Sequence, residues 1–153
     1  MHKGLPPSEI WIRDICNFNS MNYSAKNITS PEMIQDNLID IQSVIEAEYN
    51  ADNIDAVILR ATKLEGYMAL SGKLLADAKW HYSNTFQSGF MEALKTTSKY
   101  SASTINLYLK ALCKDYQYLV DWADRVNASC THQVEFSRTL ISKIKAEMQN
   151  FRQ

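Results

Sequence analysis

Apolar residues recur at helical spacing along most of the chain, and the first clear stripe follows a strong helix start. Ser30, Pro31 and Glu32 offer a hydroxyl N-cap, a proline at the first helical position and a carboxylate near the positive end of the helix dipole. The stripe that follows is Ile34, Leu38, Ile41, Ile45 and Tyr49. This pattern predicts a helix over residues 31–49, which the polar run Asn50–Asn53 ends while supplying the next cap.

A second stripe begins at Ile54 and predicts a helix that extends as far as Lys95. Gly66, Gly72 and Gly89 lie inside it, and each costs up to about 1 kcal/mol relative to alanine in a helix. Such glycines indicate a close approach of another helix, a kink or break, or contact with a ligand. The sequence leaves these alternatives open.

The last stripe follows a reversal rich in serine and threonine over 98–103, where Ser101 or Ser103 would cap a final helix reaching about Gln149. Its positions alternate steps of four and three, which is the heptad pattern of a coiled coil. They are Ile105, Leu109, Leu112, Tyr116, Leu119, Ala123, Val126, Cys130, Gln133, Ser137, Leu140, Ile144 and Met148. An uninterrupted helix here would be about 65–70 Å long. We therefore expect an antiparallel hairpin whose free face pairs with another copy of the chain.

The first 29 residues form a different segment, an apolar arm that precedes the helical body. It carries a short helical pattern over 8–17, with aromatic and aliphatic residues set among asparagine and serine. Ordering such an arm costs conformational entropy, so it must dock on something. Two interpretations stay open: docking on its own helical body, or exchange onto a neighbouring protomer.

Glycine and proline are too rare for a sheet. No proline follows Pro31, and neither residue occurs after Gly89, whereas sheets need turn residues every 8–12 positions or so. The fold class that we predict is all-α. It is a single helical domain over 1–153 in which an arm (1–29) and a shorter helix accompany a long, coiled-coil-like hairpin within the body (30–153).

Composition narrows the class of protein. Apolar residues make up 46% of the 153 residues, which argues against disorder, and no apolar run approaches the length of a membrane span. The N-terminus lacks the apolar core of a signal peptide, so we expect a cytoplasmic protein without membrane contact. The net charge of −1 excludes a globally basic nucleic-acid binder. Residues 1–60 nevertheless carry −5 and residues 98–153 carry +3, a difference that suits antiparallel packing within or between chains.

No pattern in the chain predicts catalysis, a metal or a cofactor. Cys16, Cys113 and Cys130 are widely spaced, and the internal histidines His81 and His132 lack the clustered partners of a metal site. No nucleophile elbow and no phosphate-binding glycine loop is present. We therefore expect a protein that is not an enzyme.

Binding of an anion or a nucleic acid is a second hypothesis. Cations and aromatics alternate near Trp80 and Tyr82, although packing is the favoured role of these two rings, and the final helix has a basic bias. An oligomer could sequester a nucleotide with Lys73, Lys79, Arg125 and Arg138. An accessory role in phage replication or recombination would use the same basic bias and would fall steeply with salt.

The stretch from Ser71 to Met148 resembles small, uncharacterised α-helical accessory proteins of bacteriophages and mobile elements. The resemblance rests on three runs: Leu74-Leu75-Ala76-Asp77-Ala78-Lys79, Asp124-Arg125-Val126-Asn127, and Arg138-Thr139-Leu140-Ile141-Ser142 with Lys145. It implies a protein made inside a bacterium that acts through binding and inhibits a host or defence protein. In this hypothesis the protein is a homo-oligomer and a protein partner takes its apolar anchors, for which the arm offers Trp11, Ile12, Ile15 and Phe18.

Overall fold

The computed structural model describes residues 27–96 and 100–150, and over these ranges the chain forms four helices and no strand. In chain order they are α2 (Pro31–Glu46), α3 (Ile54–Thr96), α4 (Ala102–Leu112) and α5 (Lys114–Asn150). The predicted all-α class is confirmed. The arm over 1–26 lies outside the described residues.

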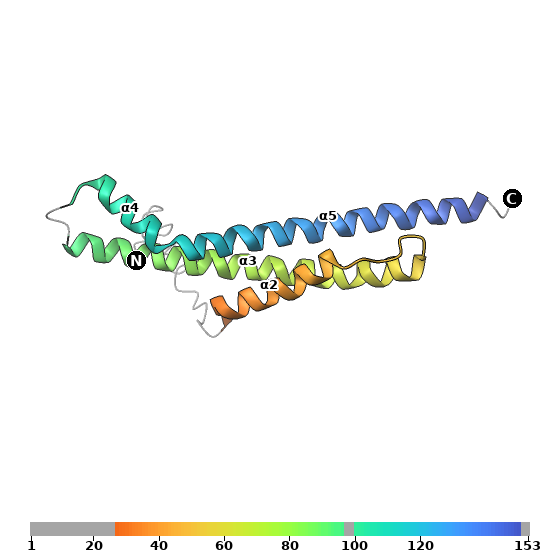
Figure 1. Cartoon of the computed structure of the whole chain (residues 1–153), viewed down its shortest axis with the longest axis horizontal. Helices are drawn as coiled ribbons and strands as arrows, with labels where there is room; N and C mark the ends of the chain where they lie inside the picture. Colours follow the sequence, from red (N-terminus) through yellow and green to blue (C-terminus); the bar gives the residue numbers. More distant parts are fainter. Residues whose placement is uncertain (1–26, 97–99, 151–153) are drawn as a thin grey trace, which may run out of the picture.

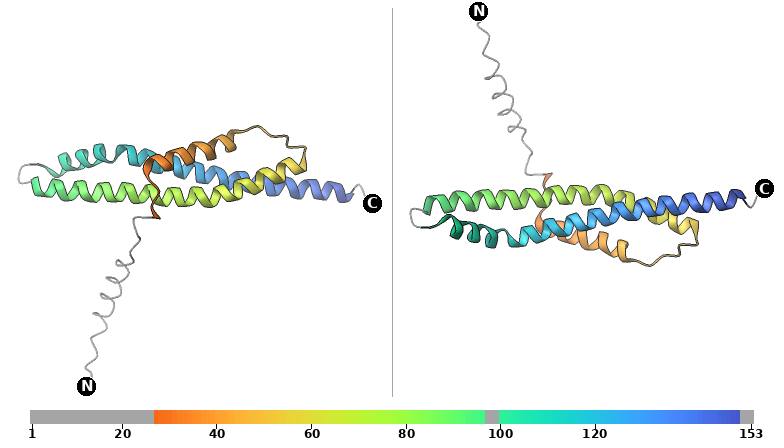
Figure 2. Two further views of the ribbon diagram at one scale, coloured as in Figure 1. Left: turned by 90° about the horizontal axis from the view of Figure 1, so that it is seen from below. Right: turned by 90° about the horizontal axis from the view of Figure 1, so that it is seen from above.

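The body is a long antiparallel hairpin of α3 and α5, as predicted, with the shorter α2 packed against both helices along part of their length (Figures 1 and 2). At 1.5 Å per residue α3 is about 64 Å long and α5 about 55 Å. We call α2 with residues 60–81 and 119–134 the three-helix part. Residues 86–96 and 100–112, where α4 packs beside the end of α3, are the distal end.

The core runs through the three-helix part. Fully buried side chains of α2 meet those of α3 and α5 in one continuous cluster, which contains Ile34, Leu38, Ile41, Leu64, Leu74, Ala78, Leu119, Ala123, Val126, Cys130 and Val134. Ser30 caps α2 as expected, since its Oγ accepts from the Met33 N–H at 3.3 Å. The helix ends at Glu46 rather than at residue 49, because Arg60 binds carbonyl groups of its last turn.

The glycines do not break α3, which is one helix from Ile54 to Thr96. The expected close approach is found at one of the three. A Cβ at Gly89 would lie 2.3 Å from Leu112 Cδ2, whereas a Cβ at Gly66 would meet nothing within 4 Å. At Gly72 it would be in ordinary contact with Asn127.

The uninterrupted final helix was a wrong prediction, because the helix breaks at Cys113 (φ −93°, ψ 1°) into α4 and α5. Ser101 caps α4, which confirms one of the two predicted caps. No glycine or proline marks the break. Its cause is tertiary: the bend lays Leu109 and Leu112 of α4 against Gly89, where no Cβ stands in the way.

The heptad stripe is right over most of α5 and wrong at three positions. Val134 is buried where Gln133 was predicted, and the Gln133 amide instead pairs with Arg60. Leu112 is two-fifths exposed beyond the break, and Met148 is exposed where α5 extends past the start of α3. No helix of the described residues has the length and hydropathy that crossing a membrane requires.

Candidate functional site

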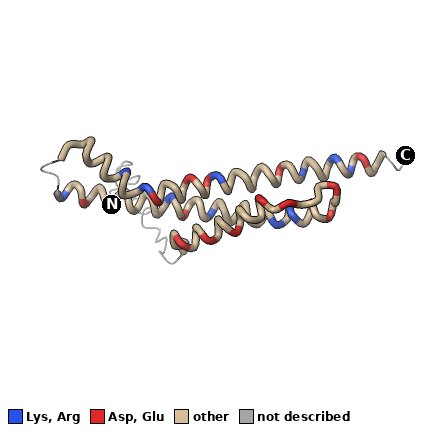
Figure 3. The backbone as a smooth tube through the Cα atoms, viewed as in Figure 1, with Lys and Arg blue, Asp and Glu red and all other residues tan. Residues whose placement is uncertain are grey.

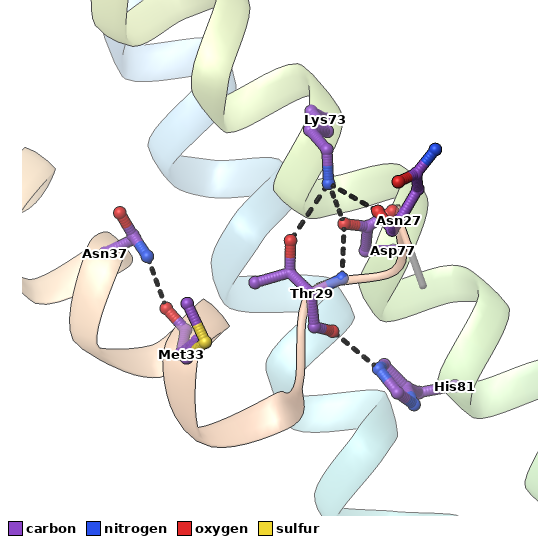
Figure 4. A network of polar contacts seen from close by, with 7 residues as sticks. All are labelled: Asn27, Thr29, Met33, Asn37, Lys73, Asp77 and His81. Atoms are coloured by element: carbon purple, nitrogen blue, oxygen red, sulfur yellow. Dashed lines mark hydrogen bonds and ion pairs between the residues drawn. The ribbon is translucent and has the colours of Figure 1, made fainter. Parts of the chain in front are cut away.

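A polar network fixes the segment that leads into α2 (Figure 4). Asp77 Oδ2 accepts from the Thr29 N–H at 3.0 Å and from Lys73 Nζ at 2.5 Å, and Lys73 Nζ also donates to Thr29 Oγ1 and to the Asn27 carbonyl. His81 Nε2 lies 2.8 Å from the Thr29 carbonyl oxygen, so this nitrogen carries the proton and donates. Three residues of α3 at steps of four therefore hold residues 27–29 on the helix surface.

The charge state of Asp77 follows from this network. Burial acts to raise its pKa, but hydrogen bonds from Lys73 and Thr29 and the charge of Lys73 outweigh burial, so the pKa of Asp77 lies below its ordinary value. Asp77 is therefore ionised at neutral pH and Lys73 is its counter-ion. Lys73, which we predicted as an anion-binding residue, is thus engaged with groups of its own chain.

The structure does not gather the other predicted anion-binding residues into one site. Arg138 pairs with Glu65 of α3 at 3.1 Å. Arg125 is exposed on α5, thirteen residues or about 20 Å along the helix from Arg138. Lys79 is exposed on α3. Each cation therefore lies in a separate environment.

Arg60, which the sequence analysis did not single out, clamps α2 to the hairpin. Its guanidinium donates to the carbonyls of Val44 (2.8 Å), Ile45 (2.8 Å) and Ala47 (3.1 Å) and to Gln133 Oε1 (2.6 Å). The Tyr49 ring lies against it, 4.5 Å from ring centroid to Cζ. A cation is favourable at the negative end of a helix dipole, so this arginine works as the C-terminal cap of α2. Spacing alone could not reveal a cap supplied by another helix.

Two further polar contacts fix how the helices align. Asn127 Nδ2 of α5 donates to Ser71 Oγ at 3.0 Å and to the Met68 carbonyl at 3.3 Å, inside the α3–α5 interface. Trp122 Nε1 donates to Gln42 Oε1 at 2.8 Å and ties α5 to α2. These groups are satisfied within the chain and have a structural role.

The described thiols and acidic groups have no evident arrangement for chemistry. Burial raises the pKa of Cys113; burial also raises that of Cys130, against a hydrogen bond with Ser71. Both sulfurs are therefore thiols at neutral pH, and the thiolate is the nucleophilic form. Within residues 27–96 and 100–150 no group of three His, Cys, Asp or Glu side chains is placed to hold a metal ion.

The distal end exposes many large apolar side chains, which packing within the chain does not explain. Half of the large apolar side chains exposed among the described residues lie there: Phe86, Phe90, Met91, Leu94, Tyr100, Leu107, Tyr108 and Leu112. α2 does not reach this end, and α4 shows almost no charge along its length (Figures 1 and 3).

Within the distal end, α4 is apolar on two sides. Leu109 is buried against α3, while Leu107 is 69% exposed and Tyr108 47% exposed on other sides of the same helix. Lys110 is its only charged residue. A helix that is apolar around most of its circumference is normally buried on all sides. We take the outward face of α4, formed by Leu107 and Tyr108, as the candidate functional site.

The heptad pattern did not reveal this site, because it places α4 inside a continuous helix. The sequence feature that indicates this site is the run Ile105–Leu112, which contains more apolar residues than one coiled-coil seam requires. The predicted partner anchors Trp11, Ile12, Ile15 and Phe18 lie outside the described residues. Comparison with protein-family models, with curated proteins and with solved structures found no match to this chain.

Proposed function

We propose that this chain is a non-enzymatic helical binding module, which contacts another protein molecule through the outward face of α4. The observation that carries the proposal is the exposure of Leu107 and Tyr108 on a helix with a single charge. Contiguous exposed apolar surface marks sites of protein contact. Exposing such surface to water costs free energy, and burying it against a partner recovers that free energy.

The geometry of α4 suits insertion into an apolar groove of a partner. Leu107 and Tyr108 are neighbouring residues about 100° apart around α4, so together they present a broad apolar surface to such a partner. Leu and Tyr side chains lose little rotamer entropy compared with longer polar side chains. The break at Cys113 separates this helix from the rigid hairpin and lets it present its own face.

The biological role proposed for this contact is that of a phage-type accessory protein in a bacterial host, which occupies a host or defence protein. Two copies of this chain can also associate through the same face, and that contact needs no other protein. The α4 surface supports a protein contact rather than a nucleic-acid contact, because phosphate binding needs cations and Lys110 is the only one on α4.

The test compares two single substitutions of equally exposed leucines. Leu107→Glu places a charge on the outward face of α4, and Leu59→Glu places the same charge on α3 at the other end of the hairpin, where Leu59 is 74% exposed. Light scattering over a range of concentrations gives the mass of each variant. Reconstitution of a purified host partner with each variant gives the affinity of a heteromeric complex.

The proposal predicts that Leu107→Glu weakens self-association or the partner complex about tenfold or more, the effect of losing one anchor, while Leu59→Glu does not. Both variants should keep the wild-type helical content by circular dichroism. If the wild-type chain forms a complex that Leu107→Glu and Tyr108→Glu both leave unchanged, α4 is not the contact and the proposal is wrong.

A further inference from the structure

The point at which the N-terminal arm joins the hairpin is fixed by the network of Figure 4. Asn27 lies at Lys73, and Thr29 lies at Asp77 and His81. The chain therefore lies along α3 before it turns into α2, and the 26 residues that precede Asn27 start from this place on the surface of α3.

The contacts also give the direction in which the chain passes around α3. Successive residues of a helix are about 100° apart, so Lys73 lies about 80° around the helix from His81. Continuing in that direction by about 100° more leads to the side of α3 that bears Phe90, which is nine residues and therefore about 180° from His81. Along the helix axis the same contacts lead from His81 back to Lys73, toward the start of α3, so an arm that reaches Phe90 must turn back along α3.

That side of α3 carries an uncovered aromatic stripe. Tyr82, Phe86, Phe90 and Leu94 follow one another at steps of four, and the rings of Tyr82 and Phe86 stack with centroids 6.3 Å apart. Phe86 and Phe90 are each about two-fifths exposed, and Leu94 is more exposed still. The stripe lies apart from the outward face of α4, because it belongs to α3 and flanks the buried positions Gly89 and Ala93.

The arm matches this stripe in chemistry and in length. Trp11, Ile15 and Phe18 are spaced by four and three residues, which places them on one side of a helix. Eleven helical residues over 8–18 would be about 16 Å long, and the stripe from Tyr82 to Leu94 is about 18 Å long.

The connecting residues are also long enough. Residues 19–26 can span about 27 Å when extended. The rise along α3 from Lys73 to Tyr82, where the stripe begins, is about 14 Å, which leaves length for the passage around the helix.

We propose that residues 8–18 pack as an amphipathic helix on the stripe Tyr82–Leu94 of the same molecule. The arm then covers the side of the hairpin opposite α2, and the four residues predicted as partner anchors are instead an intramolecular contact. This inference is independent of the α4 contact proposed above, which involves a different helix face.

The test uses the natural thiol Cys16 in the full-length chain together with one new cysteine on α3. Ser83→Cys places a thiol within about 20° of the direction of Phe90, and Ser88→Cys places one about 160° away. Both serines are exposed, and the substitution is nearly isosteric. Cys113 and Cys130 are buried and leave Cys16 and the new thiol as the reactive pair for a short bis-maleimide.

The proposal predicts a cross-link within one chain between Cys16 and position 83 that forms about tenfold or more faster than the cross-link to position 88, since docking raises the effective concentration of one thiol near the other. Trp11→Asp and Phe90→Asp should each remove that preference while the circular dichroism spectrum stays unchanged. Leu107→Glu should preserve it, so a failure of the α4 contact is distinguishable from a failure of arm docking.

Two results would overturn the inference. A cross-link between two chains at position 83 would show that the arm exchanges onto a second copy. Equal cross-linking at positions 83 and 88, with Cys16 reactive in both variants, would show that the arm does not dock on this side of α3.

Discussion

The two ends of the hairpin differ in how far their apolar side chains are covered by the rest of the chain. In the three-helix part α2 covers the groove between α3 and α5, the large core side chains are fully buried, and Arg60, Asp77 and Trp122 tie the layers together with hydrogen bonds. At the distal end α4 packs beside α3 and only slightly against α5, and large apolar side chains face outward.

Under the proposed function, this difference separates the region that stabilises the fold from the region that binds a partner. The three-helix part needs no partner molecule to satisfy its polar groups, since every buried side-chain nitrogen or oxygen among the described residues has a hydrogen-bond partner. In the proposed function, the distal end gains further stability when a partner covers it. Contacts of this kind are drawn from the less stable regions of a protein. We therefore expect substitutions to act on stability in the three-helix part and on binding at the distal end.

The largest expected contrast is between two leucine truncations. Leu64→Ala empties a fully buried position of the core and should lower the free energy of unfolding by about 2–5 kcal/mol. Leu107→Ala at the distal end should change it by no more than about 0.5 kcal/mol. Urea denaturation of both variants at a concentration where the chain is monomeric measures the difference, and equal losses would remove the distinction between the regions.

The second contrast concerns the clamp on α2. Arg60→Met keeps much of the apolar stem but removes every hydrogen bond of the guanidinium to α2, and we expect a loss of about 2–3 kcal/mol in the free energy of unfolding. Arg125→Met, at an exposed arginine of α5, serves as the matched control and should be nearly neutral. A loss of the same size in both variants would argue that Arg60 acts through charge alone.

The two ends also differ at their glycines. Gly66→Ala meets nothing within 4 Å and should stabilise the protein by up to about 1 kcal/mol through helix propensity. In Gly89→Ala the new methyl overlaps Leu112, so α4 must shift, and the variant should be less stable than Gly66→Ala by about 1 kcal/mol or more. Thermal unfolding of the pair decides this, and identical midpoints would show that α4 does not rest on Gly89.

The smallest expected effect is the pH dependence of the segment before α2. Because the pKa of Asp77 is lowered on folding, its contribution is present above its ordinary value of 3.8 and is lost as pH falls through the lowered pKa. Asp77→Asn should therefore cost about 1 kcal/mol at pH 7 and progressively less as the solution is acidified. Unfolding curves of wild type and variant from pH 7 down to acid conditions provide the check; a constant difference at all pH values would contradict it.

Periodicity predicted the hairpin because α3 and α5 bury residues at regular helical steps, and the caps at Ser30 and Ser101 are local signals. The break at Cys113 was not predictable in this way, since it depends on Gly89 of another helix. The same holds for Arg60, whose partners lie thirteen to seventy-three residues away. The α4 surface was not predictable for the same reason, because in a continuous helix its second apolar side is assigned to the coiled-coil seam.

Hydrogen–deuterium exchange of the full-length chain, measured at a concentration where it is monomeric, tests the contrast between the two regions most directly. We predict that amides of α4 exchange about a hundredfold or more faster than those of α5 over 119–134, because α4 is packed on fewer sides and opens locally. Equal protection of α4 and of this part of α5 in the monomer would contradict it, since the distal end would then be complete without a partner.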